Sequence, residues 1–142
     1  MATMVLLPPE ASAIEPSSER RPRRHWGDKF RDALRGMRRG IRGHSSFFVH
    51  FFTAALVVLA GLAFQCNLFE WCLLLLCIGS VFVAELFNSA IETLMRGLDA
   101  ATRDRCKSCL DIAAGAVLMA SLFAAMIGTL IFGARVLNVL GW

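Results

Sequence analysis

Three polar side chains interrupt an apolar stretch in the middle of the chain. Glu85, Asn88 and Glu92 occur in the segment AELFNSAIE, at offsets of zero, three and seven residues. Because an α-helix turns by about 100° per residue, these offsets place all three side chains on one helix face. These two carboxylates and one amide, here called the acidic stripe, offer the oxygen ligands that Mg²⁺ prefers.

A further carboxylate, Asp111, opens another apolar segment nearer the C-terminus. Its simplest role there is to cap a helix N-terminus. If both segments cross a membrane, a carboxylate costs about 2.5–3.5 kcal/mol at the bilayer centre, so it is rarely present without a partner or a task. Residues 26–43, described below, are expected to form a basic helix at the membrane surface. An acidic site beside this helix suits phosphoryl transfer from a soluble nucleotide to a lipid hydroxyl. A stripe that only holds helices together is the alternative.

The composition indicates that the elements carrying these residues lie in lipid. The 142 residues are 56% hydrophobic, with a mean hydropathy of +0.57, whereas soluble domains are roughly 45–50% apolar. Apolar segments over about 47–64, 68–94 and 111–132 are long enough to cross a hydrocarbon layer of ~30 Å. We therefore expect an all-α membrane protein with three transmembrane helices.

The first 43 residues divide into a tail and a helix. Residues 1–25 contain all four prolines and no apolar periodicity, which predicts a disordered tail. Over residues 26–43 apolar side chains recur every three or four positions, with basic side chains between them. This pattern predicts an amphipathic helix that lies along the lipid headgroups.

The charge distribution predicts the orientation in the membrane. Ten of the fifteen Lys and Arg residues lie between Arg20 and Arg42, and four more lie in the loop over 95–107. Since short segments rich in Lys and Arg remain cytoplasmic, we expect the N-terminus and this loop in the cytoplasm. A nucleic-acid-binding arm is the alternative for such a run, but the hydrophobic remainder argues against it, and no nucleic acid is expected as a partner.

The five cysteines do not predict a disulfide framework or a metal centre. Cys72 and Cys77 lie inside an apolar segment and are expected to act as small hydrophobic side chains. Cys106 and Cys109 form a CxxC pair on the reducing side of the membrane, without a second pair to complete a zinc tetrahedron.

The segment from Glu85 to Glu92 resembles the E-x-x-N-[ST]-A-x-E signature of prokaryotic diacylglycerol kinases and undecaprenol kinases. The resemblance covers roughly residues 26–133 and makes residues 26–142 one membrane lipid kinase domain. It implies an ATP- and Mg²⁺-dependent homotrimer in the bacterial plasma (inner) membrane that phosphorylates diacylglycerol or undecaprenol at subunit boundaries. Further matches are Phe30, Ala33 and Gly36, the pair Glu70-Trp71, and the segment from Asp111 to Leu118.

The resemblance also implies roles for individual residues. Glu85 would accept the proton of the lipid hydroxyl, and Asn88 would orient Glu85 and Glu92. Glu92 would hold the metal ion together with ATP, and Asp111 would contact the nucleotide. The family has no P-loop, and the chain contains no GxxxxGK[ST] segment.

The chain departs from the family pattern at the phosphate end. His44 stands where the family has the metal-binding Glu of its E-x-x-F motif, and histidine suits Mn²⁺ better than Mg²⁺. A structural role at the membrane interface is the alternative for His44. Phe48 replaces an Arg, and Leu110 replaces the Lys that precedes Asp111. Lys107, one helical turn before Asp111, is the candidate replacement, as are Arg103 and Arg105.

These departures leave three functions open. The first is a working lipid kinase in which other basic residues replace the lost contacts. The second is a catalytically degenerate membrane protein that keeps the fold and the acidic stripe. The third is a small ion or proton carrier, which would produce flux in liposomes without ATP hydrolysis.

Overall fold

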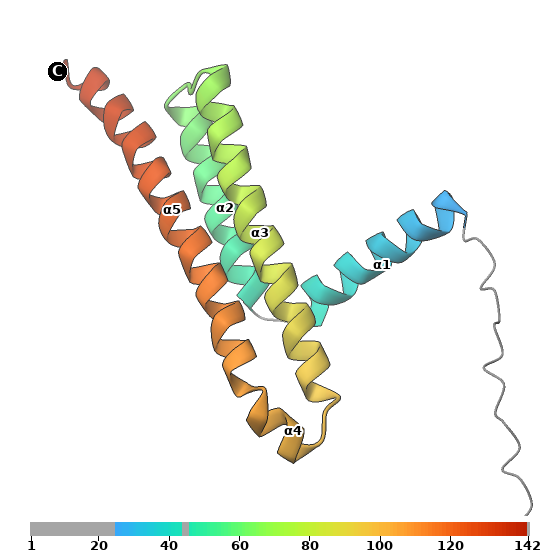
Figure 1. Cartoon of the computed structure of the whole chain (residues 1–142). Helices are drawn as coiled ribbons and strands as arrows, with labels where there is room; N and C mark the ends of the chain where they lie inside the picture. The colour runs from blue at the N-terminus through green and yellow to red at the C-terminus, as the bar shows by residue number, and fades with distance from the viewer. Residues whose placement is uncertain (1–24, 44–45, 142) are drawn as a thin grey trace, which may run out of the picture.

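The computed structural model describes residues 25–43 and 46–141, and this part of the chain is built from helices and short connections (Figure 1). The tail expected over 1–25 lies outside the described residues except for His25, and so does His44. The helices are α1 (Trp26–Gly43), α2 (Ser46–Ala63), α3 (Leu68–Arg96), α4 (Ala100–Arg105) and α5 (Lys107–Val139).

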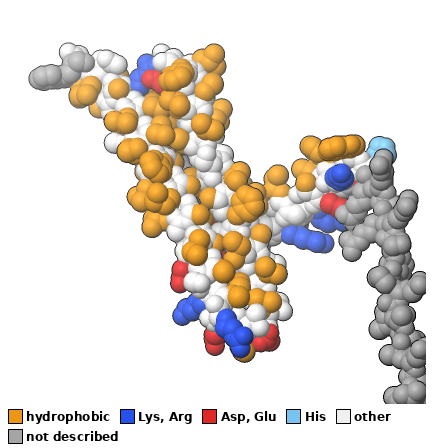
Figure 2. All heavy atoms as spheres, in the orientation of Figure 1, with side chains coloured by type: hydrophobic (Ala, Val, Ile, Leu, Met, Phe, Trp, Pro, Cys, Tyr) orange, Lys and Arg blue, Asp and Glu red, His pale blue; other side chains and the backbone are white. Residues whose placement is uncertain are grey.

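The three long helices α2, α3 and α5 form one bundle, in which α3 packs against both of the others. They contain 18, 29 and 33 residues, and each is long and apolar enough to cross a membrane. Most of their large apolar side chains point outward (Figure 2). A bundle with so much exposed apolar surface is suited to lipid rather than water. The prediction of an all-α chain with three apolar spans is therefore confirmed.

The turn between α2 and α3 is fixed by a capping box. The side chain of Asn67 accepts a hydrogen bond of 3.0 Å from the Glu70 N–H, and the Asn67 N–H donates one of 2.7 Å to Glu70 Oε2. Gln65 adopts a positive φ of 50° in this turn. The reciprocal bonds satisfy two backbone donors that a helix N-terminus leaves free. This part of the bundle is called the hairpin end below.

An ion pair joins α3 and α5 at the hairpin end. Arg135 Nε donates to Glu70 Oε1 at 3.1 Å, and Arg135 Nη2 donates to Glu70 Oε2. The guanidinium therefore binds the carboxylate through two parallel bonds, the geometry that arginine favours. Gly61 of α2 packs against the ring of Trp71, where an added Cβ would come within 2.9 Å of the indole. The hairpin end thus holds all three long helices together.

The first helix leaves the bundle and presents two different faces. Its apolar side chains gather on the side turned toward the hairpin end, and its Lys and Arg side chains lie on the other side (Figure 2). Only its C-terminal part touches the bundle, where an added Cβ at Gly40 would lie 3.0 Å from Leu86. An amphipathic helix in this posture can rest its apolar face on a membrane surface.

The ends of α3 and α5 differ from the expected spans. The third apolar helix begins at Lys107 instead of Asp111, and α4 occupies the loop expected over 95–107. Asp111 therefore lies one turn inside α5, and its expected role as a helix cap is wrong. Cys106 takes the N-cap position without a side-chain cap. Hydropathy marks the part of a helix that suits lipid, but residues 107–110 contain no glycine or proline that would end the helix before this part.

Candidate functional site

The acidic stripe lies in the half of α3 that is nearer to α4. Glu85 is 2% exposed and Asn88 is 9% exposed, while Glu92 is only partly buried. Among the described residues, Glu85, Asn88 and their neighbour Ser89 are the buried polar side chains. All three residues of the stripe lie on the α3 face that carries its buried side chains, so helix periodicity predicted their common direction correctly.

Two residues of α2 hold the carboxylate of Glu85. Ser46 Oγ donates a hydrogen bond to Glu85 Oε1, and His50 Nε2 lies 3.7 Å from Glu85 Oε2. Ser46 and His50 are four positions apart, so they share one face of α2. A buried carboxylate needs polar partners because it has lost its water, and these two side chains provide them.

Neither Ser46 nor His50 was predicted from the sequence. The available signal was their spacing, because both are polar and lie one turn apart at the beginning of an otherwise apolar helix. An isolated pair of this kind does not reveal its partner, since the partner lies on another helix. The approach of α2 to α3 is set by aromatic packing: Phe47 is buried, and its ring lies 6.4 Å from that of Phe82.

Asn88 and Glu92 form the second half of the stripe. Asn88 Nδ2 donates to Glu92 Oε1 at 2.9 Å, and Glu92 Oε2 lies 3.8 Å from Arg96 Nη1. This pair is therefore oriented within α3 itself, whereas Glu85 is oriented by α2. The stripe combines a deeply buried carboxylate with a second carboxylate that is more open to solvent.

Among the described residues, the beginning of α5 makes no hydrogen bond or ion pair with the stripe. Asp111 and Lys107 are exposed, and no described residue makes a hydrogen bond or ion pair with Asp111. The cause is helical phase, because Ala113 is the buried residue of this turn and a separation of two positions turns Asp111 by about 200° away from it. Leu110, by contrast, is partly buried.

The described residues do not form a complete metal site by themselves. No group of three or more His, Cys, Asp or Glu side chains is placed to hold a metal within residues 25–43 and 46–141. Mg²⁺ is usually bound by only one or two carboxylates, with phosphate oxygens and water completing its octahedron. Glu92, which accepts a hydrogen bond from Asn88, is a partly buried carboxylate.

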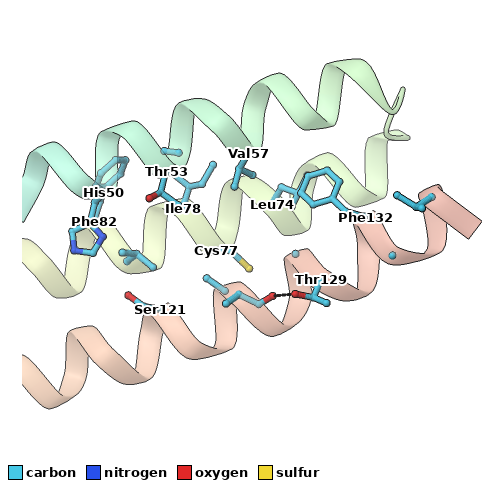
Figure 3. A pocket seen from close by; sticks show the side chains of 17 residues that line it. His50, Thr53, Val57, Leu74, Cys77, Ile78, Phe82, Ser121, Thr129 and Phe132 are labelled. Atoms are coloured by element: carbon cyan, nitrogen blue, oxygen red, sulfur yellow. Dashed lines mark hydrogen bonds between the residues drawn. The ribbon is translucent and has the colours of Figure 1, made fainter.

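The described residues form two cavities of similar volume. The first is an open depression of about 530 Å³ on the basic side of α1, lined by Arg35, Arg38, Arg39 and Arg42. The second, called the membrane groove below, has a volume of about 540 Å³ and lies between α2 and α5, with α3 as its floor (Figure 3). His50 lines the groove and also contacts Glu85.

Comparisons with known proteins identify the family of the chain. Residues 31–132 match the family model described as prokaryotic diacylglycerol kinase. The chain is 33% identical over 103 residues to a protein named undecaprenol kinase from Bacillus subtilis (strain 168), which covers 72% of this chain and 84% of that relative. No solved structure gives a significant match. The family match spans α2, α3 and α4 completely, together with most of α1 and α5, and therefore includes the whole acidic stripe. The chain belongs to the prokaryotic diacylglycerol kinase family, a family of membrane lipid kinases.

Proposed function

We propose that the protein transfers the γ-phosphoryl group of ATP to a lipid hydroxyl, that of diacylglycerol or undecaprenol, at the cytoplasmic face of a bacterial inner membrane. The observation that carries this proposal is the placement of Glu85. It is a buried carboxylate in an apolar helix, held by Ser46 and His50 and followed on the same face by a more open carboxylate. In such a pair the buried carboxylate can accept a proton, and the more open carboxylate can bind a metal ion.

Glu85 is proposed as the general base. The lipid oxygen attacks the γ-phosphorus of ATP, the bond between that phosphorus and the β–γ bridging oxygen breaks, and the hydroxyl proton passes to Glu85. ADP leaves with the bridging oxygen. Positioning and charge stabilisation supply most of the catalysis in phosphoryl transfer, so the fixed orientation of the Glu85 carboxylate is the main contribution of α2.

Glu92, oriented by Asn88, is proposed to hold Mg²⁺ with the nucleotide phosphates, and Mn²⁺ is the alternative ion. When bound there, the ion would neutralise charge on the phosphate oxygens. The arginines on the basic side of α1 are a source of positive charge for the polyphosphate, since guanidinium groups bind phosphate through two parallel hydrogen bonds. This source would offset the loss of a family lysine at Leu110. The role of His44 as a metal ligand remains a prediction, because His44 lies outside the described residues.

Asp111 and Lys107 are proposed to act across a subunit boundary. Both are exposed and point away from the packed face of α5, so a neighbouring copy in a homotrimer can receive them. In that arrangement Lys107 would contact phosphate and Asp111 would contact the nucleotide. Labelled-lipid assays on mixed trimers of Glu85→Gln and Asp111→Asn chains test this, because activity recovered on mixing requires sites shared between subunits.

The test of the proposed function is a direct kinase assay on the purified protein in detergent. Radiolabelled ATP is supplied with Mg²⁺ or Mn²⁺ and with diacylglycerol, undecaprenol or ceramide. The relative's name makes undecaprenol the first lipid to examine. Label is expected in the lipid phase and should be lost in Glu85→Gln and Glu92→Gln. Asp104→Asn is the matched control, because Asp104 is an exposed carboxylate on α4, outside the stripe.

Two other outcomes have distinct meanings. Wild-type protein that labels no lipid with either ion would contradict the kinase proposal and favour a catalytically degenerate member of the family. One observation favours a catalytically degenerate protein: the family lysine is absent, and the partly buried Leu110 stands in its place. Proton or ion flux in liposomes without ATP hydrolysis would identify a carrier.

A further inference from the structure

One residue, Cys106, forms the junction between α4 and α5. Its N–H donates to the Thr102 carbonyl of α4 at 3.1 Å, and the same residue is the N-cap of α5. The junction lies at the end of the bundle opposite the hairpin end (Figure 1). A good N-cap side chain accepts a hydrogen bond from the first turn of its helix, but Cys106 makes no bond of this kind. The first turn of α5 therefore lacks the side-chain bond that fixes a capped helix end.

A second thiol group lies within reach of Cys106. Cys109 is the third residue of α5, and its N–H donates to the Cys106 carbonyl at 2.9 Å. A turn closed by such a bond keeps the Cα atoms of its first and fourth residues within about 7 Å, and disulfides join Cα atoms about 4.4–6.8 Å apart. Cys106 is partly buried and Cys109 is exposed. The backbone thus holds two accessible cysteines in the range of an intramolecular disulfide.

The other three cysteines are arranged differently. Cys66 is buried at the hairpin end, and this burial raises the pKa of its thiol. Cys72 and Cys77 are five positions apart on α3, so their side chains diverge by about 140° around the helix. Cys77 also lines the membrane groove. Cys106 and Cys109 are therefore the two cysteines that both face each other's turn and can be reached from water.

Positive charge surrounds the pair. Arg105 and Lys107 are the direct neighbours of Cys106, and both are exposed. Charges of one sign raise the encounter rate with a small reagent of the opposite sign. Thiol–disulfide exchange requires a disulfide reagent that can approach the attacking sulfur. An anionic, water-soluble disulfide such as glutathione disulfide meets both conditions.

We propose that Cys106 and Cys109 are a redox-modification site, which an anionic low-molecular-weight disulfide oxidises to an intramolecular disulfide. One cysteine thiolate attacks a sulfur of the reagent, whose S–S bond breaks; a mixed disulfide forms and the first reagent thiol leaves. The second cysteine then attacks the mixed disulfide and releases the second reagent thiol. The two cysteines lose two electrons and two protons, and these reduce one reagent disulfide to two thiols. Exposed disulfides are readily reduced, so the modification is reversible.

The disulfide replaces the missing cap of α5. It closes a ring over the first turn, with Lys107 inside the ring and Asp111 in the turn that follows. In an α-helix the N–H groups of Leu110 and Asp111 bond to the carbonyls four residues earlier, which lie in this ring. A side-chain cap contributes about 1 kcal/mol, so oxidation should slow hydrogen exchange at these two amides about fivefold.

The effect on ATP rests on the proposed function, which places Lys107 and Asp111 at the nucleotide. A first turn that is already ordered loses less conformational entropy when it binds a ligand. Oxidation should therefore lower KM for ATP about two- to fivefold, and dithiothreitol should restore the original value.

The test uses the full-length protein in detergent, treated with glutathione disulfide, alkylated and digested with trypsin without a reductant. Trypsin cleaves after Arg105 and Lys107, and the next basic residue is Arg135. An oxidised pair therefore joins peptide 106–107 to peptide 108–135, and a monomeric band on a non-reducing gel shows that both peptides come from one chain. Hydrogen exchange is then compared between the oxidised and the reduced protein.

Two variants complete the test. Cys72→Ser removes an exposed cysteine on α3 and is the matched control; it should still give the linked peptides and the slower exchange. Cys109→Ser leaves Cys106 without a partner, so glutathione disulfide should change neither hydrogen exchange nor KM for ATP in this variant.

Three results would overturn the redox site. They are separate glutathione adducts on Cys106 and Cys109, linked peptides that come from a crosslinked pair of chains, and equal hydrogen exchange in the oxidised and reduced protein. Linked peptides from one chain with slower exchange and an unchanged KM for ATP would support the redox site and contradict the proposed nucleotide contacts of Lys107 and Asp111. The two proposals therefore fail separately.

Discussion

The hydrogen bond from Ser46 to Glu85 provides a quantitative test of how α2 supports the site. Ser46→Ala removes the donor to Glu85 Oε1 and leaves the helix otherwise unchanged. Glu85 is 2% exposed, so the Ser46 hydroxyl is one of the few polar groups that reach its carboxylate. A hydrogen bond to a charged group contributes about 1.5–3 kcal/mol. If this energy is lost in the transition state, kcat/KM for the lipid should fall roughly 10- to 150-fold.

The assay is steady-state phosphorylation of the lipid with separate titrations of lipid and ATP. The loss should appear in kcat/KM for the lipid, while KM for ATP stays unchanged, because Ser46 contacts Glu85 and not the Asn88–Glu92 pair. Ser46→Thr keeps a hydroxyl and should recover activity. Ser80→Ala is the control, since the Ser80 hydroxyl donates to a carbonyl of its own helix. Equal activity of Ser46→Ala and Ser80→Ala would refute the reasoning.

Three further predictions concern the phosphate end, the hairpin end and α4. Leu110→Lys restores the cation of the family pattern and should raise kcat severalfold or more; a lower kcat would show that the native chain places its cation elsewhere. Arg135→Gln and Glu70→Gln should each lower the midpoint of unfolding in an SDS titration, and the double variant should lose less than the sum; simple additivity would exclude the pair as a coupled unit. The Thr102 side chain and backbone N–H lower the pKa of Asp99 by hydrogen bonding. Stabilisation of α4 by this cap should therefore hold above the unfolded-state pKa of about 3.8 and disappear as pH falls through the lower folded value; an NMR titration of the Thr102 amide that shows no change at acidic pH would contradict it.

The long helices are predictable because their signals are local. Each apolar segment contains enough residues to cross a bilayer, and the alternation of apolar and basic side chains in α1 has helical periodicity. Hydropathy does not predict the residue at which α5 begins. Residues 107–110 form helix outside the most apolar region because nothing in them breaks a helix, so a span defined by apolar character begins too late.

The acidic stripe is predictable for the same reason, since its three residues lie on one helix. Its partners are not, because Ser46 and His50 come from α2 and their contact with Glu85 depends on how α2 packs on α3. The direction in which the Asp111 side chain points could not be predicted from the sequence either. It depends on which face of α5 is buried, and burial of Ala113 is a property of the packed bundle rather than of residue spacing.

The role of Glu85 as the proton acceptor can be measured most directly by single-turnover transfer of labelled phosphate to the lipid at saturating ATP. Replacement of the carboxylate by its isosteric amide in Glu85→Gln should slow this step about 10²- to 10⁴-fold. ATP affinity should remain that of the wild-type protein. A single-turnover rate in Glu85→Gln within about threefold of wild type, a change under about 1 kcal/mol, would contradict the account.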